Sequence, residues 1–281
     1  MPGTLFVVAT PIGNLEDITA RALRVLREVN VIAAEDTRRT AHLLARYAIT
    51  TPTTSLHEHN ETAKARSIVE RLERGEHVAI VSDAGTPTVS DPGRTVIQAA
   101  IAAGVRVEPV PGPNAAIATL AASGFDADRF AFFGFPPTRS KDRTRWLDDL
   151  GVAGGIVVFY EAPHRIVETL QDIERKYGNC PIALGRELTK AHEEFLRGTV
   201  GDVLKALANP RGEFTAVLDL GHKTDKMAAG APSAASIAHE FGEMTNLPGM
   251  TRRRIVAALA KKHRLPANAV YAAIESAKKL G

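Results

Sequence analysis

Short apolar runs alternate with amphipathic helical segments along the first 124 residues, and this alternation restricts the fold more than any other feature of the chain. Parallel strands need a long crossover between them, usually a helix, so the pattern predicts an α/β fold with a mostly parallel sheet covered by helices. Strands are predicted at residues 5–9, 31–34, 77–81 and 105–110, and helices at 17–29, 40–47, 61–74, 94–103 and 115–123.

The alternation restarts after Gly124, which predicts a second α/β domain. Its strands are expected at 130–133, 156–159, 182–184 and 214–218, and its helices at 141–150, 164–177 and 201–208. Residues 222–235 are rich in Gly, Ala, Ser, Pro and Lys, a composition typical of a linker. We therefore predict an α/β domain at 1–124, a second one at 125–221, a linker at 222–235 and a helix-turn-helix-like module at 236–281.

Positive charge is concentrated at the end of the chain. Residues 251–281 contain eight Lys or Arg and one Glu, which gives this segment a net charge of +7. The whole chain has a net charge of +3, so the remaining residues carry a net charge of −4. Helices are predicted at 236–244, 251–263 and 266–279, and the last two resemble a helix-turn-helix. A basic module on an acidic body fits a polyanion partner, and it fits the solvated surface of a small helical domain equally well.

Composition excludes several classes of protein. Hydrophobic residues make up 44% of the chain, and the one cysteine, Cys180, rules out an internal disulfide framework and a multi-cysteine zinc site. The apolar runs are too short to span a bilayer and no signal peptide opens the sequence, so a soluble cytoplasmic protein is expected. Dinucleotide-binding, P-loop and nucleophile-elbow motifs do not occur. His57 and His59 are a weak metal signal, and we expect no metal.

A loop rich in Gly, Pro and hydroxyl residues, Ser82–Gly93, follows the strand predicted at 77–81. Open α/β sheets bind ligands at the carboxyl ends of their strands, and Gly85 lets the backbone approach a ligand closely. Asp83 places a carboxylate at the tip of the strand. Asp91 is expected to cap the following helix, with a proline at the first helical position. The sequence therefore predicts a ligand-binding loop.

Seven segments together resemble a known family. They are Val8–Leu15 (VATPIGNL), Ala34–Arg38 (AEDTR), Ser82–Pro87 (SDAGTP), Pro111–Asn114 (PGPN), Phe133–Pro136 (FGFP), Tyr160–Arg165 (YEAPHR) and Gly185–Lys190 (GRELTK). The chain resembles the tetrapyrrole-methylase-like superfamily of S-adenosylmethionine methyltransferases, and among its members it is most similar to those that methylate 16S ribosomal RNA. The resemblance implies two α/β domains with the cofactor in the cleft between them, a homodimer, and methylation of a cytidine 2′-hydroxyl in the decoding region.

The resemblance also implies which residues contact S-adenosylmethionine. In the first half these are Pro11, Asp83, Ala84, Gly85, Val89, Ser90, Ala115 and Ala116, and in the second half Tyr160, Leu188, Thr215 and Ala216. S-adenosylmethionine combines a sulfonium cation with an adenine, so its site needs backbone donors and acceptors, negative potential and an apolar slot.

Methyl transfer to a ribose hydroxyl requires close alignment of the acceptor oxygen and is assisted by a general base. The candidates for that base are His57, Glu58, Glu187 and Lys190, and the sequence does not choose among them; our hypothesis is that Glu187 and Lys190 line the acceptor pocket. Residues predicted to contact RNA are Arg38, Arg39, His57, Arg165, Arg186, Arg252, Arg253 and Arg254.

Two other functions stay open. One is a methyltransferase of the same fold that acts on a small tetrapyrrole; the basic tail argues against it, because such an enzyme has no evident use for a basic helical module. The other is a non-catalytic nucleic-acid-binding protein; the Gly- and Pro-rich loops of the body argue against it.

Overall fold

The computed structural model describes residues 1–207, 210–221, 234–245, 250–263 and 266–279. Contacts between Cα atoms divide the chain into two compact units, Met1–Leu220 and Gly221–Gly281. Most of the predicted linker, residues 222–233, and the predicted turn at 264–265 lie outside the described residues.

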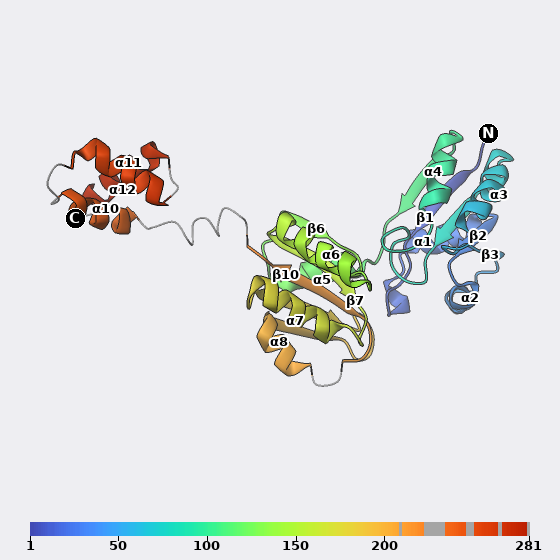
Figure 1. The fold of residues 1–281 in the computed structure, drawn as a ribbon. Helices are drawn as coiled ribbons and strands as arrows, with labels where there is room; N and C mark the ends of the chain where they lie inside the picture. Colours follow the sequence, from blue (N-terminus) through green and yellow to red (C-terminus); the bar gives the residue numbers. More distant parts are fainter. Residues whose placement is uncertain (208–209, 222–233, 246–249, 264–265, 280–281) are drawn as a thin grey trace. The chain divides into compact units, whose positions relative to one another are not determined.

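The first sheet of the larger unit is entirely parallel, with the strand order β3-β2-β4-β1-β5. Figure 1 labels β1, β2 and β3 in this sheet. Its strands are β1 (Thr4–Val8), β2 (Val31–Ala34), β3 (Thr53–Ser55), β4 (Val78–Val81) and β5 (Arg106–Val110). All residues of β2 and β4 are buried, which explains why these strands consist only of Val, Ile and Ala. Parallel sheets carry such continuous apolar strands because helices cover both of their faces.

Helices pack on both faces of this sheet. They are α1 (Ala20–Glu28), α2 (Thr37–Arg46), α3 (Glu61–Glu73) and α4 (Arg94–Ala102), and a short 3₁₀ turn, η1 (Leu15–Asp17), precedes α1. One core joins α1 and α2 to the sheet through residues such as Leu26, Leu43 and Ile32. The other joins α3 and α4 to the opposite face through Leu72 and Val96. Both faces are therefore covered, which leaves the ends of the strands available for ligands.

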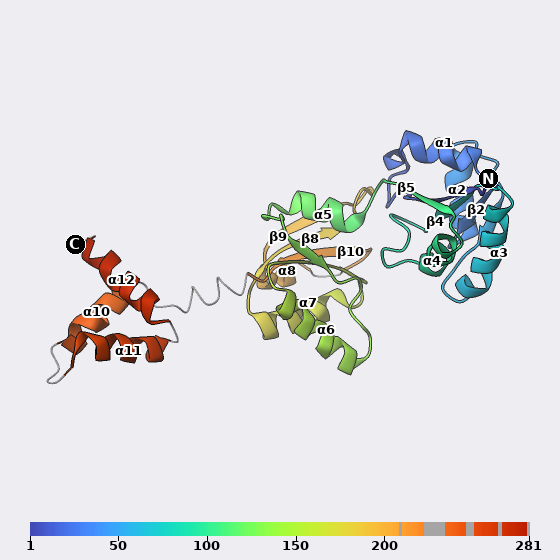
Figure 2. The same ribbon diagram turned by 90° about the horizontal axis from the view of Figure 1, so that it is seen from above.

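The second sheet is mixed, with the order β6-β7-β10-β8-β9; among its neighbouring strands β6 and β7 pair in parallel and the other described pairs are antiparallel. Its strands are β6 (Phe130–Phe132), β7 (Ile156–Glu161), β8 (Pro181–Arg186), β9 (Glu194–Thr199) and β10 (Phe214–Asp219). Two hydrophobic cores pack against this sheet. One contains residues of helices α6 (Ser140–Ala153), α7 (Ile166–Tyr177) and α8 (Val200–Ala206), and the other contains residues of α5 (Ala115–Ser123) (Figure 2).

Three features differ from the sequence-based expectations. Helix α5, expected to belong to residues 1–124, packs on the second sheet, where Ala116 and Leu120 join the core around Val158. Strands β3 and β9 were not predicted, because their residues are half-exposed or exposed and lack a continuous apolar run. The segment that packs with the second sheet therefore includes α5, which precedes Gly124 in the sequence.

The smaller unit contains three helices in its described part, α10 (Ala234–Thr245), α11 (Arg252–His263) and α12 (Ala267–Lys279). They agree closely with the helices predicted at 236–244, 251–263 and 266–279. Their core is formed by Ile237, Ile255, Val256, Leu259, Val270 and Ile274. In the described part of the whole chain, no helix is both long enough and apolar enough to cross a membrane.

Candidate functional site

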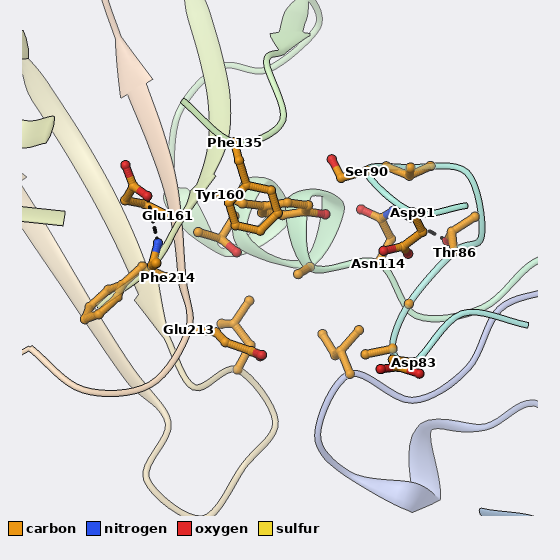
Figure 3. A pocket seen from close by; sticks show the side chains of 18 of the residues that line it. Asp83, Thr86, Ser90, Asp91, Asn114, Phe135, Tyr160, Glu161, Glu213 and Phe214 are labelled. Carbon is orange, nitrogen blue, oxygen red and sulfur yellow. Dashed lines mark hydrogen bonds between the residues drawn. The ribbon is translucent and has the colours of Figure 1, made fainter. Parts of the chain in front are cut away.

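One cavity of about 390 Å³ lies at the carboxyl ends of the strands of the first sheet. Ile12 follows β1, Glu35 follows β2 and Asp83 follows β4, so the parallel topology brings their side chains to one edge. Strands β7 and β10 of the second sheet close the opposite wall (Figure 3). The lining residues are Ile12, Glu35, Arg39, Asp83, Ala84, Gly85, Thr86, Val89, Ser90, Asp91, Asn114, Ala115, Phe135, Tyr160, Glu161, Ala162, Pro163, Leu188, Glu213, Phe214 and Thr215.

The backbone of the Ser82–Gly93 loop is held in an unusual path. Gly85 exchanges two backbone hydrogen bonds with Thr10, of 2.8 and 2.9 Å, which fix the loop to the end of β1. Gly85 has a φ of 81°, and the non-glycine residues Thr88 and Ser90 also adopt positive φ angles, of 72° and 69°. Such conformations are strained for L-residues and concentrate at ligand sites. The loop therefore has the geometry expected of a backbone that grips a ligand.

Acidic side chains dominate the wall formed by the first sheet. The carboxylate of Asp83 accepts a hydrogen bond of 2.9 Å from the backbone N–H of Asp36, and it lies 3.3 Å from the guanidinium of Arg39. Glu35 accepts a hydrogen bond of 3.2 Å from the N–H of Asp83. Burial, and to a smaller extent the negative charge of Asp83, raises the pKa of Glu35. This wall is therefore suited to a cationic ligand.

Asp91 belongs to the same acidic wall and does not cap a helix, so that prediction is wrong. Helix α4 begins after Gly93, whose φ is 124°, and Glu61 accepts the hydrogen bonds of the N–H groups of Gly93 and Thr95. Because a carboxylate from another helix takes the capping role, Asp91 lies in the cavity (Figure 3). Burial, followed by repulsion from Glu35, raises the pKa of Asp91 to about 7.

We expect Asp91→Asn to stabilise the fold above about pH 7 and to have a much smaller effect at acidic pH. The folded-state pKa of Asp91 is about 7, above its ordinary value of 3.8, so the folded protein binds more protons than the unfolded chain between these values. Wild-type stability is therefore lost as the pH rises through this range, and the variant does not share this loss. Urea denaturation of both proteins across the range measures the difference. A difference independent of pH would contradict the assignment.

The wall formed by the second sheet is aromatic and apolar. The hydroxyl oxygen of Tyr160 accepts a hydrogen bond of 3.3 Å from the N–H of Ala116, which links β7 to α5, and burial raises the pKa of this tyrosine. Phe132 and Phe135 pack against the Tyr160 ring, with centroids 4.9 and 5.4 Å away. Leu188 and Thr215 are buried beside it. This wall offers the flat, apolar surface that an aromatic base needs.

The structure brings together nine of the twelve residues predicted to contact the cofactor. Asp83, Ala84, Gly85, Val89, Ser90, Ala115, Tyr160, Leu188 and Thr215 all line the cavity. Pro11, Ala116 and Ala216 do not, although each is next in sequence to a lining residue, and Ala216 is completely buried. Their contact with a cofactor stays a prediction.

Glu187 and Lys190 are not among the lining residues, in contrast to the hypothesis that they form the wall of an acceptor pocket. The ammonium of Lys190 lies 2.9 Å from Glu187 and 3.1 Å from Glu213. Burial lowers the pKa of Lys190, but its hydrogen bonds to the two carboxylates outweigh this effect and raise it. A lysine base needs a lowered pKa, so this geometry favours a structural role, and the catalytic role stays a prediction.

The residues predicted to contact RNA are widely spread. Arg39 lines the cavity, whereas Arg38 pairs with Asp36, and Arg165 and Arg186 are held by neighbouring carbonyl and carboxylate groups. His57 is partly buried, and its Nδ1 is a buried atom without a hydrogen-bond partner in the described structure. In α11, Arg252 pairs with Glu275, while Arg253 and Arg254 are exposed.

Several lining residues were not predicted as site residues. Glu35, Phe135 and Glu161 belong to three of the seven motifs, but no contact is predicted for them, and Asp91 is predicted only as a helix cap. Phe135, Glu161 and Glu213 could not be placed, because nothing in the local pattern shows that the two sheets face one cavity. In the described ranges, no group of three or more His, Cys, Asp or Glu side chains could hold a metal ion.

Comparison with known proteins gives a consistent picture. Residues 4–204 match the Tetrapyrrole (Corrin/Porphyrin) Methylases. A protein of Xylella fastidiosa named Ribosomal RNA small subunit methyltransferase I is 43% identical over 279 residues, 98% of this chain and 94% of that protein. The protein of the same name from Thermotoga maritima is 46% identical over 218 residues, 77% of this chain and 98% of that protein.

Solved structures share the fold at low sequence identity. Diphthine synthase has a TM-score of 0.59 and 15% identity, and the match covers 77% of this chain and 90% of that one. Uroporphyrin-III C-methyl transferase from Thermus thermophilus, complexed with S-adenyl homocysteine, has a TM-score of 0.54 and 18% identity, with 77% and 97% covered. At these identities the likeness concerns the fold alone.

Proposed function

Because this chain belongs to the tetrapyrrole (corrin/porphyrin) methylase family, and within it to the ribosomal RNA small subunit methyltransferase I group, we propose that it methylates 16S ribosomal RNA with S-adenosylmethionine as methyl donor. We further propose that the acceptor is the 2′-hydroxyl of a cytidine in the decoding region, and that the enzyme works as a homodimer in the cytoplasm. The observation that carries the proposal is the acidic and aromatic cavity, most of whose lining residues lie within the region matched by the family.

The residues that line the cavity fit this donor. When bound, S-adenosylmethionine supplies an electrophilic methyl group on a positively charged sulfonium. The carboxylates of Asp83 and Glu35, and that of Asp91 in its ionised form, give their wall a negative potential that would attract the sulfonium and ammonium groups of the donor. Gly85 has a φ of 81°, so any other residue at this position would strain the loop that forms this wall. Leu188 and Thr215 offer the adenine a buried slot.

The chain promotes transfer by orientation and by exclusion of water. The fixed loop around Gly85 and the buried strands β7 and β10 would hold S-adenosylmethionine from two sides and limit its movement when it is bound. Alignment at a separation of about 3–3.5 Å provides much of the rate enhancement in such displacements. Arg39, which lines the cavity and is exposed, neutralises the phosphate next to the acceptor ribose.

Recognition of RNA is divided between the body and the basic tail. The family match at residues 4–204 lies within the unit Met1–Leu220, and the Thermotoga maritima relative is matched over 98% of its length by 77% of this chain. We therefore assign the chemistry to residues 1–220 and part of the affinity for RNA to the helices that carry Arg253 and Arg254.

The test uses S-adenosylmethionine with an isotope-labelled methyl group. We expect the purified protein to transfer the label to small ribosomal subunits or 16S RNA, and mass spectrometry of nuclease digests to find it as 2′-O-methylcytidine at one position. A porphyrinogen tested in parallel should remain unlabelled. Label in the porphyrinogen alone would support the small-tetrapyrrole alternative, and the absence of cofactor binding by calorimetry would support a non-catalytic nucleic-acid-binding protein.

A further inference from the structure

Phe135 is a large apolar side chain that remains 53% exposed although it lines the cavity. Figure 3 shows its ring beside that of Tyr160; the centroids are 5.4 Å apart and the rings are inclined by 56°. We propose that Phe135 is the stacking platform for the nucleobase of the acceptor nucleotide. This inference rests on the proposed methylation of RNA and adds how the acceptor is positioned.

The loop that carries Phe135 is rigidly held on both sides of it. Before it, the carbonyl of Phe133 accepts a hydrogen bond of 3.3 Å from the indole of Trp146, and the carbonyl of Gly134 accepts one of 2.9 Å from the N–H of Tyr160. After it, the guanidinium of Arg165 donates to the carbonyls of residues 136 and 137, at 2.7 and 3.1 Å. Such fixation keeps an exposed aromatic ring in one place, which lowers the entropy lost on binding.

Arg165 is itself fixed by a buried carboxylate. Its guanidinium lies 3.6 Å from Glu161, whose side chain is fully buried, and its own side chain is only 17% exposed. The arginine therefore acts as a brace for the loop rather than as a contact for phosphate. These contacts favour a structural role for Arg165, and its predicted contact with RNA stays a prediction.

The fixed loop also determines how far the Phe135 ring lies from the loop assigned to the donor. Gly134 has a φ of 58°, and a Cβ added to it would lie 3.3 Å from the hydroxyl of Ser90 in the donor-binding loop. Phe135 is therefore next to the loop that we assign to S-adenosylmethionine, and a ribose bound between the donor and the ring would present its base to Phe135. Nucleotide geometry places base and 2′-hydroxyl on adjacent ribose carbons, which matches this arrangement.

The exposure of the ring favours the acceptor base over the adenine of the donor. The donor must be enclosed to exclude water, and Leu188 and Thr215, at 8% and 4% exposure, provide an enclosed slot. Half of Phe135 remains accessible from solvent, where a polymer can reach it. An acceptor base must leave its own stack, which costs a few kcal/mol, and stacking on an aromatic side chain offsets part of that cost.

The test compares Phe135→Ala, Phe135→Leu and Phe135→Trp with a matched control, Phe130→Ala. Phe130 is also an exposed phenylalanine, at 42%, on the neighbouring strand β6, but it does not line the cavity. We expect Phe135→Ala to lower kcat/KM for RNA by about 5- to 150-fold, the equivalent of one lost stacking interaction. Phe135→Leu should lose nearly as much, because leucine is apolar but not planar. Phe135→Trp keeps an aromatic face and should recover most of the loss seen in Phe135→Ala, whereas the control Phe130→Ala should remain close to wild type.

Two further readouts identify the occupant. A fluorescent cytosine analogue at the methylated position should be quenched by the wild-type protein and by Phe135→Trp, but not by Phe135→Ala. Affinity for S-adenosylmethionine, measured by calorimetry, should be unchanged in all variants. Normal RNA kinetics and quenching in Phe135→Ala would overturn the inference, and so would weakened donor binding, which would place the donor adenine on the ring. If the wild-type protein labelled no RNA at all, the proposed function itself would fail.

Discussion

Removal of residues 233–281 is expected to weaken binding of 16S RNA on the order of 100-fold near physiological salt, if the tail neutralises about four phosphates. Each neutralised phosphate releases condensed counterions, so the loss should be accompanied by a flatter dependence of affinity on salt. Affinity for S-adenosylmethionine should not change, because every residue that lines the cavity lies in the unit Met1–Leu220. At saturating RNA, kcat should be retained as well.

Filter binding across a series of salt concentrations measures this effect. A charge variant of the full chain, with Arg253 and Arg254 both replaced by Gln, separates loss of charge from loss of the whole unit. Its matched control replaces Arg24 and Arg66, which are exposed arginines on α1 and α3 paired with carboxylates four residues away. If the truncation left RNA affinity unchanged, the tail would have no role in RNA recognition. If the control variant lost as much RNA affinity as the Arg253 and Arg254 variant, the loss would reflect overall charge and not the position of these arginines.

Replacement of Glu161 by Ala is expected to destabilise the body by about 3–5 kcal/mol, the loss typical when one partner of a buried ion pair is removed. The Glu161 carboxylate accepts hydrogen bonds from the hydroxyl of Thr169 at 2.6 Å and from the N–H of Ala162 at 2.8 Å, and it lies beside Arg165. Without it, the nearly buried guanidinium of Arg165 loses its carboxylate, and the buried hydroxyl of Thr169 loses the acceptor of its proton, in a medium of low dielectric constant.

Urea denaturation, followed by circular dichroism, measures the free energy of unfolding. Glu161→Gln should lose less than Glu161→Ala, because its amide oxygen still accepts one of the hydrogen bonds. Glu70→Ala is the control for a surface ion pair with Arg66, where at most about 0.5 kcal/mol is expected. A loss below about 1 kcal/mol for Glu161→Ala would mean that water or a shifted Arg165 compensates, which would contradict the rigid brace.

The order of strands and helices could be predicted from the sequence because the buried strands of the first sheet are uninterrupted apolar runs. Residues 31–34 and 115–123 agree with β2 and α5 to the residue. Strands β3 and β9 could not be found, because they lie at sheet edges and hydrogen bonding to a neighbour defines them more than side-chain pattern does. The packing of α5 on the second sheet is likewise a tertiary property.

In the candidate site, too, some residues could be predicted from the sequence and others could not. Residues on the Ser82–Gly93 loop could be predicted, because glycine, proline and a carboxylate after a buried strand carry a physical meaning on their own. Asp91 shows where this reasoning stops: its sequence context is that of a helix cap, and only the structure reveals that Glu61, 30 positions earlier, has taken that role. Phe135 depends on two sheets meeting at one cavity, which no local pattern encodes.

A crystal structure of the protein with S-adenosylhomocysteine tests the central claim most directly. We predict ligand density in the cavity between the Gly85 loop and the Tyr160 wall, with the amino group near the Asp83 carboxylate and the adenine against Leu188 and Thr215. Density for the ligand at any other place on the chain, or an empty cavity at saturating ligand, would contradict the account.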